Sequence, residues 1–125
     1  MTDLENSQIK GRILVVDDED HIRRVLELML RREGYEVAAA SGGQEALNKF
    51  AAESFDMVFL DLRMPDLDGL TVLSRIREAE PDQTVVMVTA YASVDTALNA
   101  MKQGAFDYIG KPFKEEEILA VVDKG

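Results

Sequence analysis

The sequence contains no cysteine or tryptophan, and it has one histidine and three prolines. Without cysteine, disulfide bonds and thiolate metal sites are excluded, and the composition fits a reducing compartment. No apolar run approaches the ~20 residues of a membrane-spanning helix, and residues 1–10 lack the hydrophobic core of a signal peptide. We therefore expect a cytoplasmic protein that makes no contact with a membrane.

Positive charge is also scarce, since 14 lysines and arginines face 24 aspartates and glutamates, for a formal net charge of −10. This balance would repel phosphate backbones, so we expect no direct contact with nucleic acid. Acidity suits a site that gathers carboxylates around a cation, although a solvated acidic surface explains most of these residues equally well. The length of 125 residues fits one domain with a single core.

Short apolar runs alternate with segments whose apolar residues recur at helical spacing. The pattern predicts an α/β fold, a doubly wound five-stranded parallel sheet with helices on both faces. It does not fix the strand order, but a flavodoxin-like order 2-1-3-4-5 would place the first and third strands side by side. We expect residues 1–11 to form a flexible N-terminal tail. The predicted strands are 12–16, 36–40, 57–60, 84–88 and 107–110.

Several local signals predict where the helices begin and end. Ser41 and Gln44 have the spacing of a capping box for the second helix, and Ser93 can cap the fourth. Glycines at 34 and 104 are placed to close the first and fourth helices. The sequence stops at Gly125, so we expect the last helix to be cut off there. In the fourth helix the spacing typical of a buried face is carried by Val94, Ala97, Leu98 and Met101.

Polar residues follow four of the predicted strands. Asp17 and Asp18 follow the first strand, Asp61 the third, Thr89 ends the fourth, and Lys111 follows the fifth. The carboxyl ends of parallel strands form one rim, which is where α/β sheets bind ligands. Taken alone, Asp61 could be an ordinary polar residue at the start of a loop. The presence of four further polar residues at the same rim favours a binding site.

The chemistry of this rim follows from the residue types. Three neighbouring carboxylates repel one another unless a cation lies among them, and an all-oxygen donor set suits Mg²⁺ better than a softer metal. Asp61, at the end of the most apolar strand, is the natural nucleophile for a phosphoryl group. Thr89 and Lys111 would then bond the phosphoryl oxygens.

Four segments carry a family resemblance: ILVVDDE at 13–19, LDLRMPDLDG at 60–69, MVTAYA at 87–92 and GAFDYIGKPF at 104–113. Together, in this order and spacing, they resemble the receiver domain of two-component response regulators. The run TAY…DTA…GAFDY is most similar to receivers of the NtrC-like enhancer-binding transcription activators. The resemblance extends from Arg12 to the C-terminus, which implies a receiver domain over residues 12–125.

The resemblance implies a role for each residue at the phosphoryl site. Asp61 would be the phosphoacceptor and Lys111 the partner of the phosphoryl group. Asp18 would bind Mg²⁺ directly and Asp17 through water, while the backbone carbonyl of Arg63 would complete the metal site.

The resemblance also implies how the signal leaves the site. Thr89 would be the switch hydroxyl and Tyr108 the switch aromatic, although Tyr108 alone could be an ordinary half-buried residue. Arg63 and Tyr91 occupy positions that tune the lifetime of the aspartyl phosphate in the family. A cis peptide bond between Lys111 and Pro112 would direct the lysine toward the acids.

As a function, the resemblance implies a signalling module that is switched by phosphorylation and is not a turnover enzyme. A sensor histidine kinase would supply the phosphoryl group, and the face formed by the fourth helix, fifth strand and last helix would respond. We expect a homodimer through that face, with ATPase and DNA-binding output domains beyond Gly125 for transcriptional activation.

Two other functions compete with this reading. A Mg²⁺-dependent aspartyl-phosphate hydrolase of the haloacid-dehalogenase type also uses an aspartate after an apolar strand, but it needs an acid two residues later, where this chain has Arg63. A nucleotide-binding module would need a glycine-rich phosphate loop, and neither G-x-x-x-x-G-K-[ST] nor G-x-G-x-x-G occurs. His21, the single histidine, is a candidate phosphodonor in principle, but we expect it to be a solvated surface residue.

Overall fold

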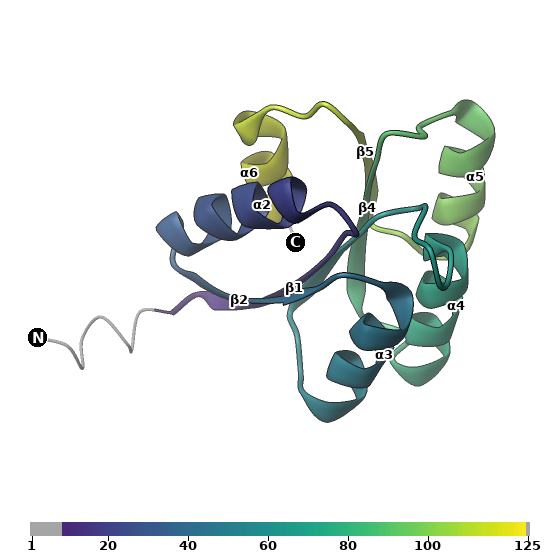
Figure 1. The fold of residues 1–125 in the computed structure, drawn as a ribbon, viewed down its shortest axis with the longest axis horizontal. Coiled ribbons are helices and arrows are strands. Elements are labelled where there is room, and N and C mark those ends of the chain that lie inside the picture. Colours follow the sequence, from purple (N-terminus) through teal and green to yellow (C-terminus); the bar gives the residue numbers. More distant parts are fainter. Residues whose placement is uncertain (1–8, 125) are drawn as a thin grey trace, which may run out of the picture.

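The computed structural model describes residues 9–124, in which five strands alternate with five helices (Figure 1). Residues 1–8 of the predicted tail lie outside the described residues, and the first strand begins at Gly11, one residue before its predicted start. No helix within residues 9–124 combines the length and apolar character needed to cross a membrane. The strands are β1 (Gly11–Val16), β2 (Tyr35–Ala40), β3 (Met57–Leu60), β4 (Thr84–Thr89) and β5 (Asp107–Gly110); the helices are α2 (Asp20–Arg32), α3 (Gly43–Ala52), α4 (Gly69–Ala79), α5 (Val94–Lys102) and α6 (Glu115–Lys124).

All strand pairs are parallel, and the order across the sheet is β2-β1-β3-β4-β5. Helices α2 and α6 cover one face of the sheet, while α3, α4 and α5 cover the other (Figure 1). The predicted doubly wound fold and the flavodoxin-like strand order are confirmed. Because this order reverses direction between β1 and β3, a crevice opens at their carboxyl ends.

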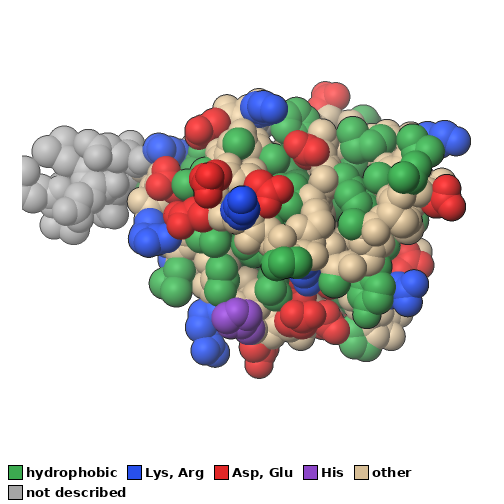
Figure 2. Space-filling model, turned by 90° about the horizontal axis from the view of Figure 1, so that it is seen from above, with side chains coloured by type: hydrophobic (Ala, Val, Ile, Leu, Met, Phe, Trp, Pro, Cys, Tyr) green, Lys and Arg blue, Asp and Glu red, His purple; other side chains and the backbone are tan. Residues whose placement is uncertain are grey.

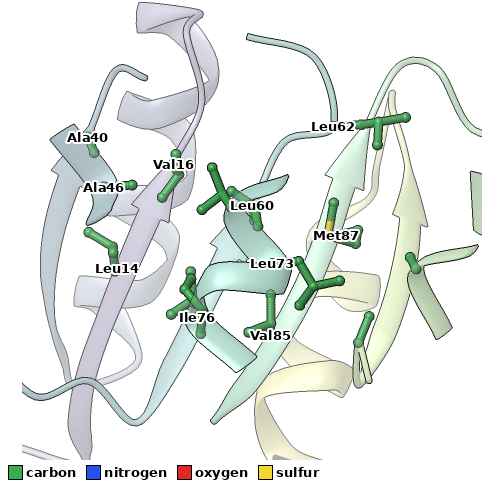
Figure 3. Packing of buried hydrophobic residues seen from close by; sticks show 14 of the residues in the cluster. Leu14, Val16, Ala40, Ala46, Leu60, Leu62, Leu73, Ile76, Val85 and Met87 are labelled. Carbon is green, nitrogen blue, oxygen red and sulfur yellow. The ribbon is translucent and has the colours of Figure 1, made fainter. Parts of the chain in front are cut away.

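The core consists of two layers, one on each face of the sheet. Leu14 and Val16 point into the layer beneath α3 and α4, and Ile13 and Val15 point into the layer beneath α2 and α6. This alternation follows from the two-residue period of a strand, and burial on both faces explains why the central strand β3 is apolar at every position. In Figure 3, α4 places Leu73 and Ile76 against Leu60, Val85 and Met87 of the central strands.

The predicted helix ends are largely confirmed. Gly34 and Gly104 follow the C-cap residues of α2 and α5 and have positive φ angles of 97° and 92°, a conformation that favours glycine. Ser93 caps α5, since its hydroxyl accepts from the Thr96 N–H while the Thr96 hydroxyl accepts from the Ser93 N–H. This reciprocal pair holds the first turn of α5 in place.

The predicted capping box of Ser41 and Gln44 is wrong. The residue before the first turn of α3 is Gly42, which has no side chain to cap the helix. Ser41 instead donates from its N–H and its hydroxyl to the Glu45 carboxylate. The first N–H groups of α3 are satisfied by Asp66, which comes from the loop between β3 and α4.

The prediction that the apolar face of α5 is buried in the core is also wrong. Val94, Leu98 and Met101 are exposed, and Ala100 is the buried residue of this helix. Helical spacing identifies a common face, but it does not say whether that face meets the core or the solvent. In α5 the apolar face points outward.

Candidate functional site

The register of the sheet brings the first group of predicted site residues together. Val16 of β1 is paired with Leu60 of β3, so the next residues, Asp17 and Asp61, leave the sheet at the same level. The Asp61 N–H donates to the Val16 carbonyl over 3.0 Å, which fixes this end of β3. Asp17, Asp18 and Asp61 each offer a carboxylate oxygen, and these oxygens lie within 4.8 Å of one another.

The other half of the sheet supplies the hydroxyl and the ammonium group. Thr89 of β4 is paired with Gly110 of β5, and the Lys111 N–H donates to the Thr89 carbonyl over 2.9 Å. The Lys111 ammonium donates to Asp17 Oδ2 at 2.7 Å and lies 3.5 Å from Asp61 Oδ2. The peptide bond between Lys111 and Pro112 is cis, as the resemblance predicted.

Burial and charge shift the pKa values at this site. Asp17, Asp61 and Thr89 are buried, whereas Asp18 is exposed. Burial raises the pKa of Asp17, against bonds from Lys111 and the Glu19 N–H. Burial and the charge of Asp17 raise the pKa of Asp61, while Lys111, the Thr89 hydroxyl and a backbone N–H oppose that shift.

The pKa of Lys111 moves upward. Burial alone would lower this pKa, but the bond and charge of Asp17, together with the charge of Asp61, outweigh burial. Lys111 therefore remains an ammonium ion at neutral pH and serves as the cation between the two buried carboxylates.

The donor set fits a hard divalent cation. All three convergent groups are carboxylates, with neither sulfur nor imidazole among them, and their combined charge exceeds the single positive charge of Lys111. Two or three carboxylates beside open space for water are the usual arrangement for Mg²⁺. A cavity of about 310 Å³ provides that space, and its lining includes Asp18, Asp61 and Arg63.

The mouth of this cavity is bordered by an arginine stacked on an aromatic ring. The guanidinium carbon of Arg63 lies 4.4 Å from the centre of the Tyr91 ring, and both residues line the cavity. The Tyr91 N–H also donates to the Thr89 hydroxyl over 3.0 Å. The loops after β3 and β4 thus meet above Asp61.

Tyr108 is joined to α5 by a residue that the sequence did not single out. Its hydroxyl lies 2.6 Å from the Thr96 hydroxyl, the same group that completes the capping box of α5. Thr96 and Tyr108 are 12 residues apart, and this separation matches no helix or strand periodicity that would predict the contact. The contact depends on how α5 packs against β5.

A larger depression of about 700 Å³ lies beside α4 and α5. Its lining mixes Arg75 and Lys102 with Asp68 and Glu78, and it contains none of the strand-end carboxylates. The smaller cavity at the rim therefore remains the better candidate site, because the convergent charges and shifted pKa values are found there.

Comparison with known proteins gives one family and many relatives. The family model described as "Response regulator receiver domain" matches residues 13–123. The regulatory protein AtoC of Escherichia coli is 43% identical over 114 residues, which cover 91% of this chain and 25% of AtoC. The DNA-binding transcriptional regulator NtrC of Proteus hauseri is 43% identical over 92% of this chain and 24% of its own length. The chain thus spans about a quarter of the length of these two relatives.

Solved structures agree with these matches. The response regulator protein TrrA from Thermotoga maritima, solved in complex with Mg²⁺-BeF, is 41% identical and has a TM-score of 0.83. The alignment covers 90% of this chain and 96% of TrrA.

Proposed function

The chain belongs to the response regulator receiver domain family, and from this premise we propose that Asp61 accepts a phosphoryl group from a sensor histidine kinase. One observation carries the proposal: Asp61 is buried at the carboxyl end of the central strand, among two further carboxylates and a lysine ammonium. A nucleophilic carboxylate beside a lysine ammonium, with further carboxylates that can hold a metal cation, is an arrangement suited to phosphoryl acceptance.

In the proposed step a carboxylate oxygen of Asp61 attacks the phosphorus atom of a phosphohistidine. The new P–O bond forms as the P–N bond breaks, and the electron pair of the P–N bond remains on the imidazole, which takes up a proton from solvent. The product is an aspartyl phosphate, so Asp61 must be ionised when the step begins. Lys111 supports ionisation of Asp61, because its positive charge lies 3.5 Å from Asp61 Oδ2.

Bound Mg²⁺ would supply positive charge that offsets the charge of the transferring phosphoryl oxygens. Asp17, Asp18 and Asp61 would hold the ion with the backbone carbonyl of Arg63. Asp17 accepts from the Glu19 N–H over 2.9 Å, and this bond keeps its carboxylate directed into the site.

Thr89 and Lys111 would bind two oxygens of the phosphoryl group once it is attached. In the described structure the Lys111 ammonium is bonded to Asp17, so it would exchange part of that contact for the new oxyanion. The Thr89 hydroxyl accepts from the Tyr91 N–H and lowers the pKa of Asp61, so its own proton would turn from the carboxylate to an oxygen of the attached phosphoryl group.

The response would travel from Thr89 to Tyr108 and then to the face formed by α5, β5 and α6. A charge-assisted hydrogen bond from Thr89 contributes about 1.5 to 3 kcal/mol. Moving an equilibrium from 1:99 to 99:1 needs about 5.5 kcal/mol, so Thr89 must act together with Lys111 and the metal ion. Thr89→Ala should therefore accept the phosphoryl group and switch only partly.

The hydrolase alternative is not favoured. A haloacid-dehalogenase enzyme needs a general acid two residues after the nucleophile, and Arg63 occupies that position with its guanidinium turned onto the Tyr91 ring. The family match points to a receiver as well. We infer that the domain takes up and loses one phosphoryl group without steady turnover.

The proposal extends to the whole protein. Because the relatives AtoC and NtrC are about four times as long as the matched segment, we infer output domains beyond residue 125, with ATPase and DNA-binding activity for transcriptional control. A cytoplasmic location belongs to the same proposal. The exposed apolar residues of α5 would support a homodimer through the responding face.

Intact-mass spectrometry tests the proposal. With Mg²⁺ and an excess of a small acyl phosphate, the wild type should gain the mass of one phosphoryl group. Asp61→Asn should gain none, and Asp82→Asn, which alters an exposed acid in the turn before β4, should match the wild type. Rapid release of many phosphates per molecule, or phosphorylation of the Asp61→Asn variant, would contradict it.

A further inference from the structure

The first turn of α3 takes its cap from a distant part of the chain. The Gly43 N–H donates to Asp66 Oδ1 over 3.0 Å, and the Gln44 N–H donates to Asp66 Oδ2 over 2.9 Å. Asp66 Oδ1 also accepts from the N–H of Leu67 in its own loop. One carboxylate thus satisfies donors of α3 and of the loop that leads from β3 to α4.

The contact between this loop and α3 is close. A Cβ atom added at Gly42 would lie 2.9 Å from Asp66 Oδ1, and one added at Gly43 would lie 2.7 Å from the Cβ of Leu67. Two glycines therefore allow the backbone of α3 to approach the loop. The bonds to Gln44, Gly43 and Leu67, in that order of effect, lower the pKa of Asp66, so its carboxylate is ionised at neutral pH.

The same loop carries part of the candidate metal site. At its start Asp61 is bonded to β1, and at its end the Gly69 N–H donates to the Leu62 carbonyl over 2.6 Å. Between these points, across residues 63–67, the Asp66 carboxylate provides the hydrogen bonds that join the loop to another element of the described chain. Arg63, whose carbonyl would complete the metal site, lies three residues before Asp66.

We propose that Asp66 is a positioning residue for the metal site: its bonds to α3 fix the loop so that the Arg63 carbonyl faces Asp17, Asp18 and Asp61. This inference rests on the proposed function, and it adds α3 as the support of a site built from β1 and β3. The Ser41–Gln44 pair could not replace this support, because Ser41 is engaged with Glu45.

The test compares two aspartates of the same loop. Asp66→Ala removes the bonds to α3, whereas Asp68→Ala removes the cap of α4, in which Asp68 accepts from the Thr71 N–H over 2.9 Å. Asp66 accepts three backbone hydrogen bonds and Asp68 accepts one, so thermal unfolding should show a loss of stability for both variants and the larger loss for Asp66→Ala. Mg²⁺ affinity, measured by amide shifts during a titration, separates them.

We expect Asp66→Ala to raise the Mg²⁺ dissociation constant about tenfold, as is usual when a supporting contact of a metal site is removed. Asp66→Asn keeps one acceptor oxygen and should give a smaller increase, and Asp68→Ala should stay within about twofold of the wild type. Equal affinity of Asp66→Ala and wild type would overturn the inference, as would an equal weakening by Asp68→Ala. A wild type that binds no Mg²⁺ would overturn the proposed function itself, and the inference with it.

Discussion

At the scale of single residues, the site places negative charge where the fold disfavours it. Asp17 and Asp61 are buried side by side, and Lys111 is the cation within 4 Å of both. Two buried carboxylates with one ammonium leave an excess negative charge, which a metal ion can offset. The uncompensated negative charge therefore lowers the stability of the folded protein when no cation is bound.

Asp61→Asn should stabilise the metal-free protein at pH 7. The pKa of Asp61 is raised above its ordinary 3.8, so the folded state holds a proton that the unfolded state has already released. The stability that the protonated Asp61 contributes is fully present below pH 3.8, and it is lost as the pH rises through the raised pKa of the folded state. Removing the charge should raise the free energy of unfolding at pH 7, as measured with urea.

The same experiment carries its own controls. The increase in the free energy of unfolding caused by Asp61→Asn should become smaller as the pH falls toward 4, because Asp61 of the wild type is then protonated. Mg²⁺ should stabilise the wild type more than the variant. Asp82→Asn, at an exposed position, should change neither quantity. A loss of stability in metal-free Asp61→Asn at pH 7 would show that the Asp61 charge is well compensated in the folded state.

Tyr91→Ala should shorten the lifetime of the aspartyl phosphate. The Arg63 guanidinium rests on the Tyr91 ring beside the cavity that contains Asp61, so removal of the ring would free the arginine and admit water. An exposed cation–π contact contributes about 0.5 to 1 kcal/mol, which corresponds to roughly two- to fivefold in rate. Loss of the phosphoryl mass over time measures this rate, and an unchanged half-life would mean that the stack does not shield the site.

At the scale of elements, Thr96 links the start of α5 to Tyr108 of β5. We expect a double-mutant cycle of Thr96→Val and Tyr108→Phe to show a coupling of about 0.5 to 1.5 kcal/mol, the usual contribution of one hydrogen bond. Ser41→Ala also removes one hydroxyl hydrogen bond, the one to Glu45, but Ser41 follows β2 at the opposite edge of the sheet from β5, so its coupling to Tyr108→Phe should be close to zero. Additive effects of the first pair in urea unfolding would mean that the bond does not hold α5 to β5.

Elements built from local signals could be predicted from the sequence. The strands β3 and β4 could be predicted because each holds an apolar run, as expected of strands that are buried on both faces. The N-terminus of α3 could not, because the sequence pattern of Ser41 and Gln44 is local while the actual cap is 22 residues away. A cap supplied by a distant loop leaves no periodic trace in the sequence.

The same limit separates the predicted from the unpredicted parts of the site. Asp17, Asp61, Thr89 and Lys111 could be brought to one rim by the sheet order alone, since each lies at a strand end. The stack of Arg63 on Tyr91 and the contact of Thr96 with Tyr108 depend on loop and helix positions. Such contacts could not be predicted from the sequence, because the period of a strand does not set the directions of side chains beyond its end.

At the scale of the whole molecule, the acid rim and the apolar face of α5 are separate surfaces that β4 and β5 connect. Figure 2 shows hydrophobic side chains gathered on the side where α5 lies, whereas mixed charges cover the side of α2. The exposed apolar residues of the α5 face are Val94, Leu98, Met101 and, just beyond the helix, Phe106. A compact group of this kind on a chain with a net charge of −10 is a candidate contact surface.

Leu98→Asp should therefore weaken the proposed homodimer of the phosphorylated domain. Leu98 is 55% exposed, and burying the rest of its side chain is worth about 1 kcal/mol. A two-fold symmetric dimer buries this residue twice, so the loss of about 2 kcal/mol weakens association roughly 30-fold. Leu28→Asp is the matched control, because Leu28 is 59% exposed but lies on α2, away from the proposed interface. Sedimentation of both phosphorylated variants across a concentration series measures the dissociation constants. If the two substitutions weaken the dimer equally, or if Leu98→Asp leaves it intact, the dimer does not form through α5.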